Sequence, residues 1–344
     1  MKSAVFHGKR DVRIDERDVP KLNPDEVLIK VMACGICGSD LHIYEGDQGS
    51  TTTVPPQIMG HEFSGIVTEV GADVKNCKVG DRVCVDPADN CGECFYCVSG
   101  MMSHCDNMRA IGTNVDGGFS EYCKVKSRLI HHLDETVTYV EGAMAEPLAC
   151  CLNGIDRSNI KTGDAVVIYG GGMIGLLMLQ LAKLKGASKV IVIEPVDERR
   201  VMALKLGADL VVNPFEASAS EVLDAHKISH VRTVIECSGL KKTAEEAIEI
   251  VDKQGTVLLF AVTAVDATID MKTYMVFQKE ISVVGSFCSP YTMARAVELI
   301  NTHRIDVTSM IGGIGYLEDL AEVLSNAEKR AKGKYVILPN GDLQ

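Results

Sequence analysis

Two short stretches near the N-terminus carry side chains that can bind a metal. Cys37 is followed by Ser39 and His42, and the pair His61 and Glu62 comes after an intervening polar stretch. A thiolate, an imidazole and a carboxylate are ligands that Zn²⁺ accepts, and three protein ligands leave a fourth position for water or substrate. The pattern therefore predicts an open, catalytic metal site rather than a closed structural one.

Four further cysteines follow one another at the short spacing C-x2-C-x2-C-x7-C. They are Cys91, Cys94, Cys97 and Cys105. Four thiolates complete a tetrahedral zinc site, which stabilises a loop too polar to be held by burial. The alternative is an iron–sulfur cluster, but bacterial ferredoxins place the fourth cysteine after three residues and follow it with proline. Here the interval is seven residues and Asp106 follows, so the spacing predicts structural zinc.

A glycine-rich turn follows the β-branched run at 165–169 and precedes an apolar helix pattern. Gly170, Gly172 and Gly175 fit G-x-G-x-x-G, which lets the backbone approach a pyrophosphate at the N-terminus of a helix. Glu194, at the end of the next apolar run, is placed to accept the ribose hydroxyls, which favours NAD over NADP. The predicted cofactor-binding residues are Gly170, Gly172, Met173, Ile174, Gly175, Glu194 and Arg199. Arg199 keeps NADP open as the alternative.

The composition excludes several functional classes. A net charge of −12 and a pI near 5.3 oppose binding to nucleic acid or to an anionic membrane. The region around the four clustered cysteines is acidic and has no Lys or Arg before Arg109, which opposes a nucleic-acid-binding zinc module. The N-terminus lacks a signal-peptide pattern, and the longest apolar run, 173–182, is too short to span a bilayer. We therefore expect a cytoplasmic protein with no membrane partner.

The metal-binding stretches belong to a β-rich part of the chain, and the glycine turn to a different one. Short apolar or alternating runs recur over residues 2–135, whereas 137–158 has a helical composition. From 164 to 284, β-branched runs alternate with helical patterns, which predicts βα units and a parallel, doubly wound sheet. After 285, helices at 292–301 and 317–331 and a closing strand at 333–338 do not extend this pattern.

The segments 35–42 and 60–65 resemble the signature of the zinc-dependent medium-chain dehydrogenases, the alcohol, polyol and threonine dehydrogenase family. The resemblance extends over essentially the whole chain and includes the cysteine spacing. It implies an α/β protein with a GroES-like β-barrel catalytic domain at 1–150, completed by 286–344. A Rossmann NAD-binding domain at 151–285, with a doubly wound parallel sheet, would complete the fold.

The family resemblance also implies roles for individual residues. Zinc on Cys37 and His61 would activate the hydroxyl of a secondary alcohol, and Ser39 and His42 would relay its proton to solvent. Alcohol dehydrogenases use a second cysteine as the third ligand, whereas this chain has Glu146 at the corresponding position. Glu62 is the other carboxylate near the metal, so Glu62, Glu146 and water remain alternatives.

A carboxylate in place of a thiolate makes a zinc site harder, which suits a substrate that binds through two oxygens. This agrees with the polyol branch of the family, and the resemblance to sorbitol and galactitol-phosphate dehydrogenases implies a polyol or polyol phosphate as the small-molecule substrate, oxidised to the ketose with NAD. The alternatives are L-threonine or butanediol, or a catalytically silent protein on the same fold. The resemblance further implies a homodimer or homotetramer.

Overall fold

The computed structural model describes residues 1–47, 49 and 51–341. The chain divides into two compact units. The first comprises Met1–Ala149 and Pro290–Gln344, and the second comprises Cys150–Ser289. None of the helices in the described ranges combines the length and the apolar character needed to cross a bilayer.

The first unit is built on β-sheets, as predicted. One sheet has the order β2-β1-β4, and a second joins seven strands in the order β10-β6-β5-β3-β18-β17, with β9 also paired to β3. The N-terminal strands are β1 (Lys2–Gly8), β2 (Asp11–Glu16), β3 (Glu26–Gly35), β4 (Gln57–Ile58), β5 (Glu62–Val70), β6 (Arg82–Val85), β7 (Ala88–Asp89), β8 (Arg109–Ala110), β9 (Tyr122–Lys126) and β10 (Ile130–His132). Alternating apolar side chains of these strands, among them Ile29, Phe63 and Val125, form one buried core together with Phe119.

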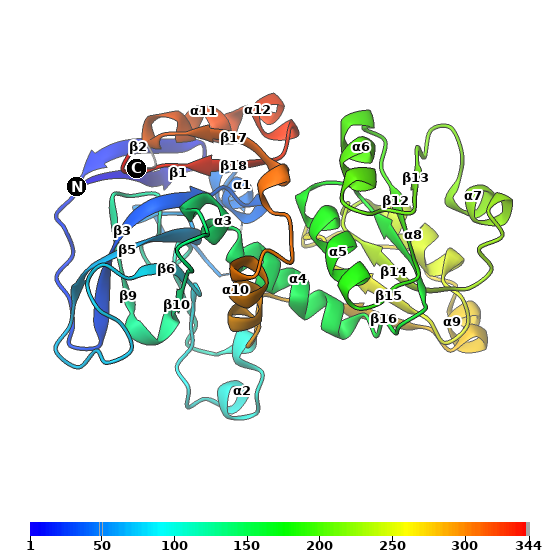
Figure 1. Cartoon of the computed structure of the whole chain (residues 1–344), viewed down its shortest axis with the longest axis horizontal. Helices are drawn as coiled ribbons and strands as arrows, with labels where there is room; N and C mark the ends of the chain where they lie inside the picture. Colours follow the sequence, from blue (N-terminus) through cyan, green and yellow to red (C-terminus); the bar gives the residue numbers. More distant parts are fainter. Residues whose placement is uncertain (48, 50, 342–344) are drawn as a thin grey trace. The chain divides into compact units, whose positions relative to one another are not determined.

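Residues at the C-terminus return to the first unit. The strands β17 (Ile311–Gly315) and β18 (Lys334–Ile337) extend the seven-stranded sheet, and Figure 1 shows the red β18 among the blue strands of the N-terminal segment. The prediction that this tail does not extend the parallel sheet is therefore confirmed. The strand β17 was not predicted, because its sequence contains three glycines, which are poor strand formers.

The predicted single helix at 317–331 is wrong. The segment instead forms a 3₁₀ turn at Leu317–Asp319, helix α11 (Leu320–Ser325) and helix α12 (Ala327–Ala331). Asn326 causes the break, because its side chain accepts hydrogen bonds from the backbone N–H groups of Glu328 and Lys329 and so starts a new helix. The unit's other helices are α1 (Gly38–Tyr44), α2 (Phe95–Val98), α3 (Tyr139–Ala143), the start of α4 (Ala145–Arg157) and α10 (Met293–Asn301), with further 3₁₀ turns at Met102–His104, Ser127–Leu129 and Thr308–Met310.

The second unit contains a six-stranded parallel sheet in the order β13-β12-β11-β14-β15-β16. The strands are β11 (Ala165–Tyr169), β12 (Lys189–Ile193), β13 (Leu210–Val212), β14 (Val231–Glu236), β15 (Thr256–Leu259) and β16 (Ser282–Gly285). This order is that of a doubly wound nucleotide-binding sheet. Strands β12 and β13 are added on one side of β11, and the last three strands are added on its other side. The predicted fold class is confirmed.

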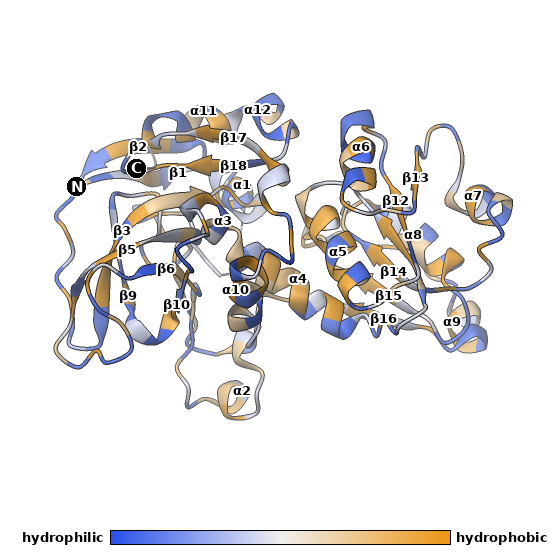
Figure 2. Cartoon of the chain, viewed as in Figure 1, coloured by the Kyte–Doolittle hydropathy of each residue, from blue (hydrophilic) through white to orange (hydrophobic). Residues whose placement is uncertain are grey.

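Helices connect the strands of this sheet. They are α5 (Met173–Leu184), α6 (Asp197–Lys205), α7 (Ala219–Ala225), α8 (Lys241–Ile250) and α9 (Thr273–Lys279). All residues of β11 and β12 except Lys189 are buried and apolar, and β12 is predominantly orange in Figure 2. Burial on both faces explains why these strands appear in the sequence as continuous rather than alternating apolar runs.

Candidate active site

Helix α1 positions the first residues of the candidate metal site. Cys37 lies immediately before this helix, with an extended backbone (φ −98°, ψ 161°), and its N–H donates to the carboxylate of Asp40 at 2.8 Å. Cys37 is the N-terminal capping residue of this helix, and the side chain three residues later satisfies its free N–H group.

Strand β5 brings the second group of residues to the same place. His61 immediately precedes β5, and its Nδ1 lies 3.7 Å from Asp40 Oδ1, whereas its Nε2 lies 3.4 Å from Ser39 Oγ. The candidate ligand atoms of Cys37, His61 and Glu62 all lie within 4.8 Å of one another. Residues separated by a long polar stretch in the sequence thus form one cluster.

The cluster is buried and rich in negative charge. Asp40 and Glu62 are fully buried, and His61 is 8% exposed. Burial alone would lower the pKa of His61, but the attraction of Asp40, Cys37 and Glu146 raises it well above its usual value. The same burial raises the pKa of Asp40. Such a concentration of anionic groups around an imidazole is an environment that attracts a cation.

Several polar atoms of this cluster have no hydrogen-bond partner within the described residues. They are Asp40 Oδ1, His61 Nδ1 and Glu62 Oε1, whereas Glu62 Oε2 accepts no hydrogen bond but forms an ion pair with Lys334. A buried polar atom without a partner is costly, typically by about 1–3 kcal/mol. One thiol, one imidazole and one carboxylate at this separation fit a divalent zinc ion, which would satisfy atoms that the protein leaves unpaired.

Two predicted residues lie near the cluster without belonging to it. Glu146 is half-buried in the first turn of α4, and its charge contributes to the raised pKa of His61, but the three-residue cluster contains Glu62 instead. His42 is half-buried in the last turn of α1, three residues after Ser39. Residues at this spacing lie on the same side of a helix.

Lys334 is a site residue that sequence reasoning missed. It lies at the start of β18, is almost completely buried, and forms an ion pair with Glu62 Oε2. Burial alone would lower the pKa of Lys334, but the negative charges of Glu62, Cys37 and Asp40 raise it. No local pattern marks this lysine, because it reaches the site through strand pairing between distant parts of the chain. Asp40, by contrast, could have been found from its position three residues after the capping residue.

The four clustered cysteines form a second group of metal ligands. Their sulfur atoms lie within 4.8 Å of one another, with 3.5 Å between the Sγ atoms of Cys91 and Cys105. The N–H of Cys94 donates to Cys91 Sγ at 3.4 Å, and backbone donors of this kind lower the pKa of Cys91 to about 6. Burial raises the pKa of Cys97 to about 12. Four thiols in this arrangement fit a closed tetrahedral zinc site.

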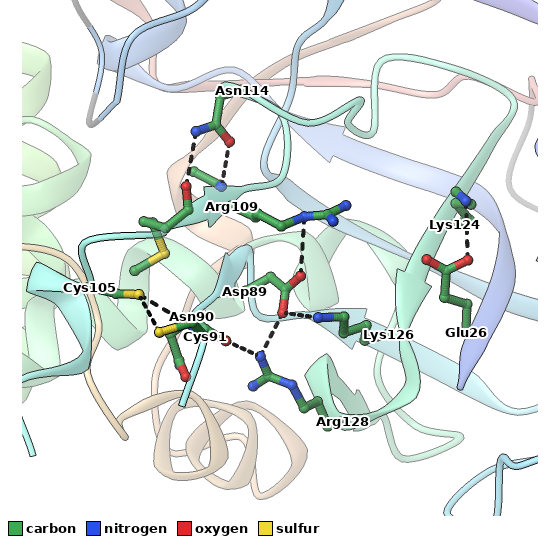
Figure 3. A network of polar contacts seen from close by, with 12 residues as sticks. Glu26, Asp89, Asn90, Cys91, Cys105, Arg109, Asn114, Lys124, Lys126 and Arg128 are labelled. Carbon is green, nitrogen blue, oxygen red and sulfur yellow. Dashed lines mark hydrogen bonds and ion pairs between the residues drawn. The ribbon is translucent and has the colours of Figure 1, made fainter. Parts of the chain in front are cut away.

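The segment 91–105, which contains the four cysteines, forms a cysteine lobe. A buried carboxylate connects this lobe to the β-sheets. Asp89, in β7, is contacted by Lys126 Nζ at 3.1 Å, Arg128 Nη2 at 2.6 Å and Arg109 Nε at 3.5 Å (Figure 3). Arg128 also donates to the carbonyl of Asn90 at 2.6 Å, next to the first cysteine. The network thus links the strand before the first cysteine to residues 126 and 128.

The glycine turn of the second unit joins β11 to α5. Gly170 has a φ of +97°, and a Cβ atom on Gly175 would lie 1.8 Å from the carbonyl oxygen of Gly170, so neither position readily accepts another residue. Met173 and Ile174 begin α5. Gly172, just before them, has a φ of −70° and open space around its Cβ position. Open space in this loop is what the close approach of a pyrophosphate requires.

Glu194 lies directly beside this turn. Its two carboxylate oxygens accept hydrogen bonds from the N–H groups of Gly171 at 2.7 Å and Val196 at 2.9 Å. Arg199 Nη1 lies 3.8 Å from the same carboxylate. The predicted acidic residue and the predicted arginine are therefore neighbours, at the carboxyl end of the strand next to β11.

Comparison with known protein families yields two matches. The family described as "Alcohol dehydrogenase GroES-like domain" matches residues 23–135, and the family described as "Zinc-binding dehydrogenase" matches residues 173–302. Together these two segments cover most of the chain.

The chain is also similar to named dehydrogenases over most of its length. It is 32% identical to D-arabinitol dehydrogenase 1 of Uromyces fabae, with 98% of this chain and 97% of the relative covered. It is 40% identical to L-threonine 3-dehydrogenase of Pyrococcus horikoshii, with 83% and 81% covered.

Two solved structures share the fold. A zinc-binding dehydrogenase from Sinorhizobium meliloti bound to NADP has a TM-score of 0.93 at 35% identity, covering 98% of this chain and 99% of that chain. Galactitol-1-phosphate dehydrogenase of Escherichia coli has a TM-score of 0.88 at 29% identity, covering 98% and 100%.

Proposed function

This chain belongs to the zinc-binding medium-chain dehydrogenase family, and from that membership we propose that it oxidises a secondary alcohol of a polyol or polyol phosphate to the ketose. The convergence of Cys37, His61 and Glu62 within 4.8 Å is the observation that carries the proposal. Zinc held by Cys37, His61 and either Glu62 or Glu146 would supply Lewis-acid polarisation of the substrate hydroxyl. The four lobe cysteines would hold a structural zinc ion.

We assign the movement of the hydroxyl proton to helix α1. Ser39 is half-buried beside His61 and can accept this proton, while His42, one turn later on the same side of the helix, can pass it to water. A nicotinamide cofactor held at the turn that contains Gly170, Gly172 and Gly175 would supply the acceptor for the hydride of the carbon that bears the hydroxyl. The substrate thus loses one hydride and one proton, and the products are the ketose, the reduced cofactor and a proton.

For the cofactor, Glu194 supports NAD. A buried carboxylate beside the glycine turn can accept ribose hydroxyls and would repel a 2′-phosphate. The Sinorhizobium meliloti relative binds NADP, and Arg199 next to Glu194 provides the charge that would accommodate the phosphate. NAD and NADP should therefore be compared in the same assay.

The test is an assay of purified, zinc-loaded protein with free polyols, polyol phosphates, L-threonine and butanediol, each with NAD and with NADP. We expect NADH formation with one polyol class, and a loss of about 10²–10⁴-fold in rate for Ser39→Ala if it transfers the proton. L-Threonine is the second candidate because of the 40% identity to a threonine dehydrogenase. Activity on L-threonine alone would refute the polyol assignment.

We further propose that two copies pair through β16, which is an edge strand of the parallel sheet. Three of its four residues are exposed, as are Tyr274 and Phe277 on α9 immediately before it. An exposed edge strand presents unpaired backbone groups that a second copy can satisfy. Val283→Lys should shift the molecular mass measured by light scattering from dimer to monomer, whereas Val265→Lys on an exposed loop should not. An unchanged mass for Val283→Lys would contradict this interface.

A further inference from the structure

The ion pair between Lys334 and Glu62 is unusual because both side chains are buried. Their side chains are 3% and 0% exposed, and the ion pair joins Lys334 Nζ to the carboxylate oxygen Oε2. The other oxygen, Oε1, is buried and has no hydrogen-bond partner among the residues that the structure describes. Glu62 also belongs to the cluster with Cys37 and His61. Its carboxylate therefore has one oxygen held by the protein and one left for another ligand.

Strand pairing explains how the lysine reaches across the sheet. In the order β18-β3-β5, Gly35 of β3 pairs with Val336 of β18 on one side and with Glu62 of β5 on the other. Lys334 is two residues before Val336, so its side chain lies on the same face of the sheet. A side chain at position 35 would block the path between the two charges.

Gly35 provides the space for this contact. A Cβ atom on Gly35 would lie 2.4 Å from Glu62 Oε2 and 2.7 Å from Lys334 Cε, which is closer than atoms can approach. Gly35 does not have a positive φ, so its backbone conformation would accept other residues. Glycine is needed here because any side chain would collide with the ion pair. Three neighbouring strands together hold one oxygen of Glu62.

We propose that Lys334 is a positioning residue that restrains Glu62 to a single oxygen toward the catalytic zinc and so keeps one metal position open for the substrate hydroxyl. This inference rests on the proposed function, because it requires zinc at Cys37 and His61. Without the lysine, both oxygens of Glu62 become available to the metal. The negative charges of Cys37, Asp40 and Glu62 would then be balanced by the metal alone.

The test uses Lys334→Met in the full chain, with cobalt exchanged for zinc. A second carboxylate oxygen raises the coordination number of cobalt, so the visible d–d absorption should weaken relative to the wild type. Lys334→Met also removes a buried positive charge from the site, so the variant should retain the metal more strongly than the wild type. We expect its release to a chelator to slow about tenfold, on the scale of 10–100-fold that partners of metal ligands usually exert. Lys332→Met, at an exposed lysine nearby, is the matched control.

Two further variants separate positioning from a merely structural role. Glu62→Gln removes the carboxylate that the lysine restrains, so adding Lys334→Met to it should leave the cobalt spectrum unchanged. Gly35→Ala keeps both charges but separates them, and it should weaken the absorption as Lys334→Met does, even if the latter fails to fold. A wild-type spectrum and release rate in both Lys334→Met and Gly35→Ala would refute the inference. Wild-type protein that binds only the lobe metal would instead refute the proposed function.

Discussion

At the scale of single residues, Asp89 offers a direct test of how the cysteine lobe is held. Its buried carboxylate is shared by Lys126, Arg128 and Arg109 (Figure 3). Asp89→Asn preserves the shape but removes the charge, leaving three partly exposed cations without their anion. Because hydrogen bonds to charged groups contribute about 1.5–3 kcal/mol, we expect the unfolding free energy to fall by about 2 kcal/mol. Urea denaturation measures this, with the exposed Asp73→Asn as control, and equal midpoints would contradict the assigned role.

The residues of the candidate metal site also differ in whether the sequence alone could identify them. Cys37, His61 and Glu62 were predicted together because their residue types and glycine-rich surroundings are informative without a structure. Lys334 and Gly35 were not predicted, since their relation to Glu62 exists only in the register of three strands. A lysine in an apolar strand carries no mark of its partner. The assignment of each predicted ligand remains a proposal that metal binding must test.

At the scale of elements, the turn between β11 and α5 contains two glycines with contrasting constraints. Gly172→Ala meets no atom within 4 Å and has an ordinary φ of −70°, so the folded protein should accept it. A bound pyrophosphate would meet the added methyl group, and we expect NADH affinity to fall at least about tenfold, which corresponds to about 1.4 kcal/mol. NADH fluorescence titration provides the measurement.

Gly175→Ala is the contrasting variant for this turn, because its Cβ would collide with the carbonyl oxygen of Gly170. It should lower thermal stability as well as NADH binding, whereas Gly172→Ala should lower binding alone. Normal NADH affinity in Gly172→Ala would show that the cofactor does not approach the backbone there.

Elements with clear local signals were predicted best. Strand β11 has the bounds of the β-branched run predicted at 165–169, because a buried β-branched run that ends at glycine is distinctive. The boundary at Asn326 and the short helix α1 were missed. In both places a side chain that caps a helix, Asn326 or Asp40, determines the structure more strongly than the pattern of apolar residues.

At the scale of the whole molecule, the alternation of strands and helices over 164–284 was sufficient to predict the parallel sheet and its doubly wound class. The return of β17 and β18 to the first unit was expected only from the family resemblance, since no local pattern specifies which sheet a late strand joins. This return brings Lys334 of β18 to Glu62 of β5 in the candidate metal site.

The most direct test of the account is to count metal ions in wild-type protein and in Cys37→Ser while NADH formation is followed with the best polyol substrate. We expect two zinc ions per wild-type chain. We expect one in Cys37→Ser, with NADH formation abolished, NADH binding unchanged and the lobe zinc retained. Two zinc ions and full activity in Cys37→Ser would contradict a catalytic metal at Cys37.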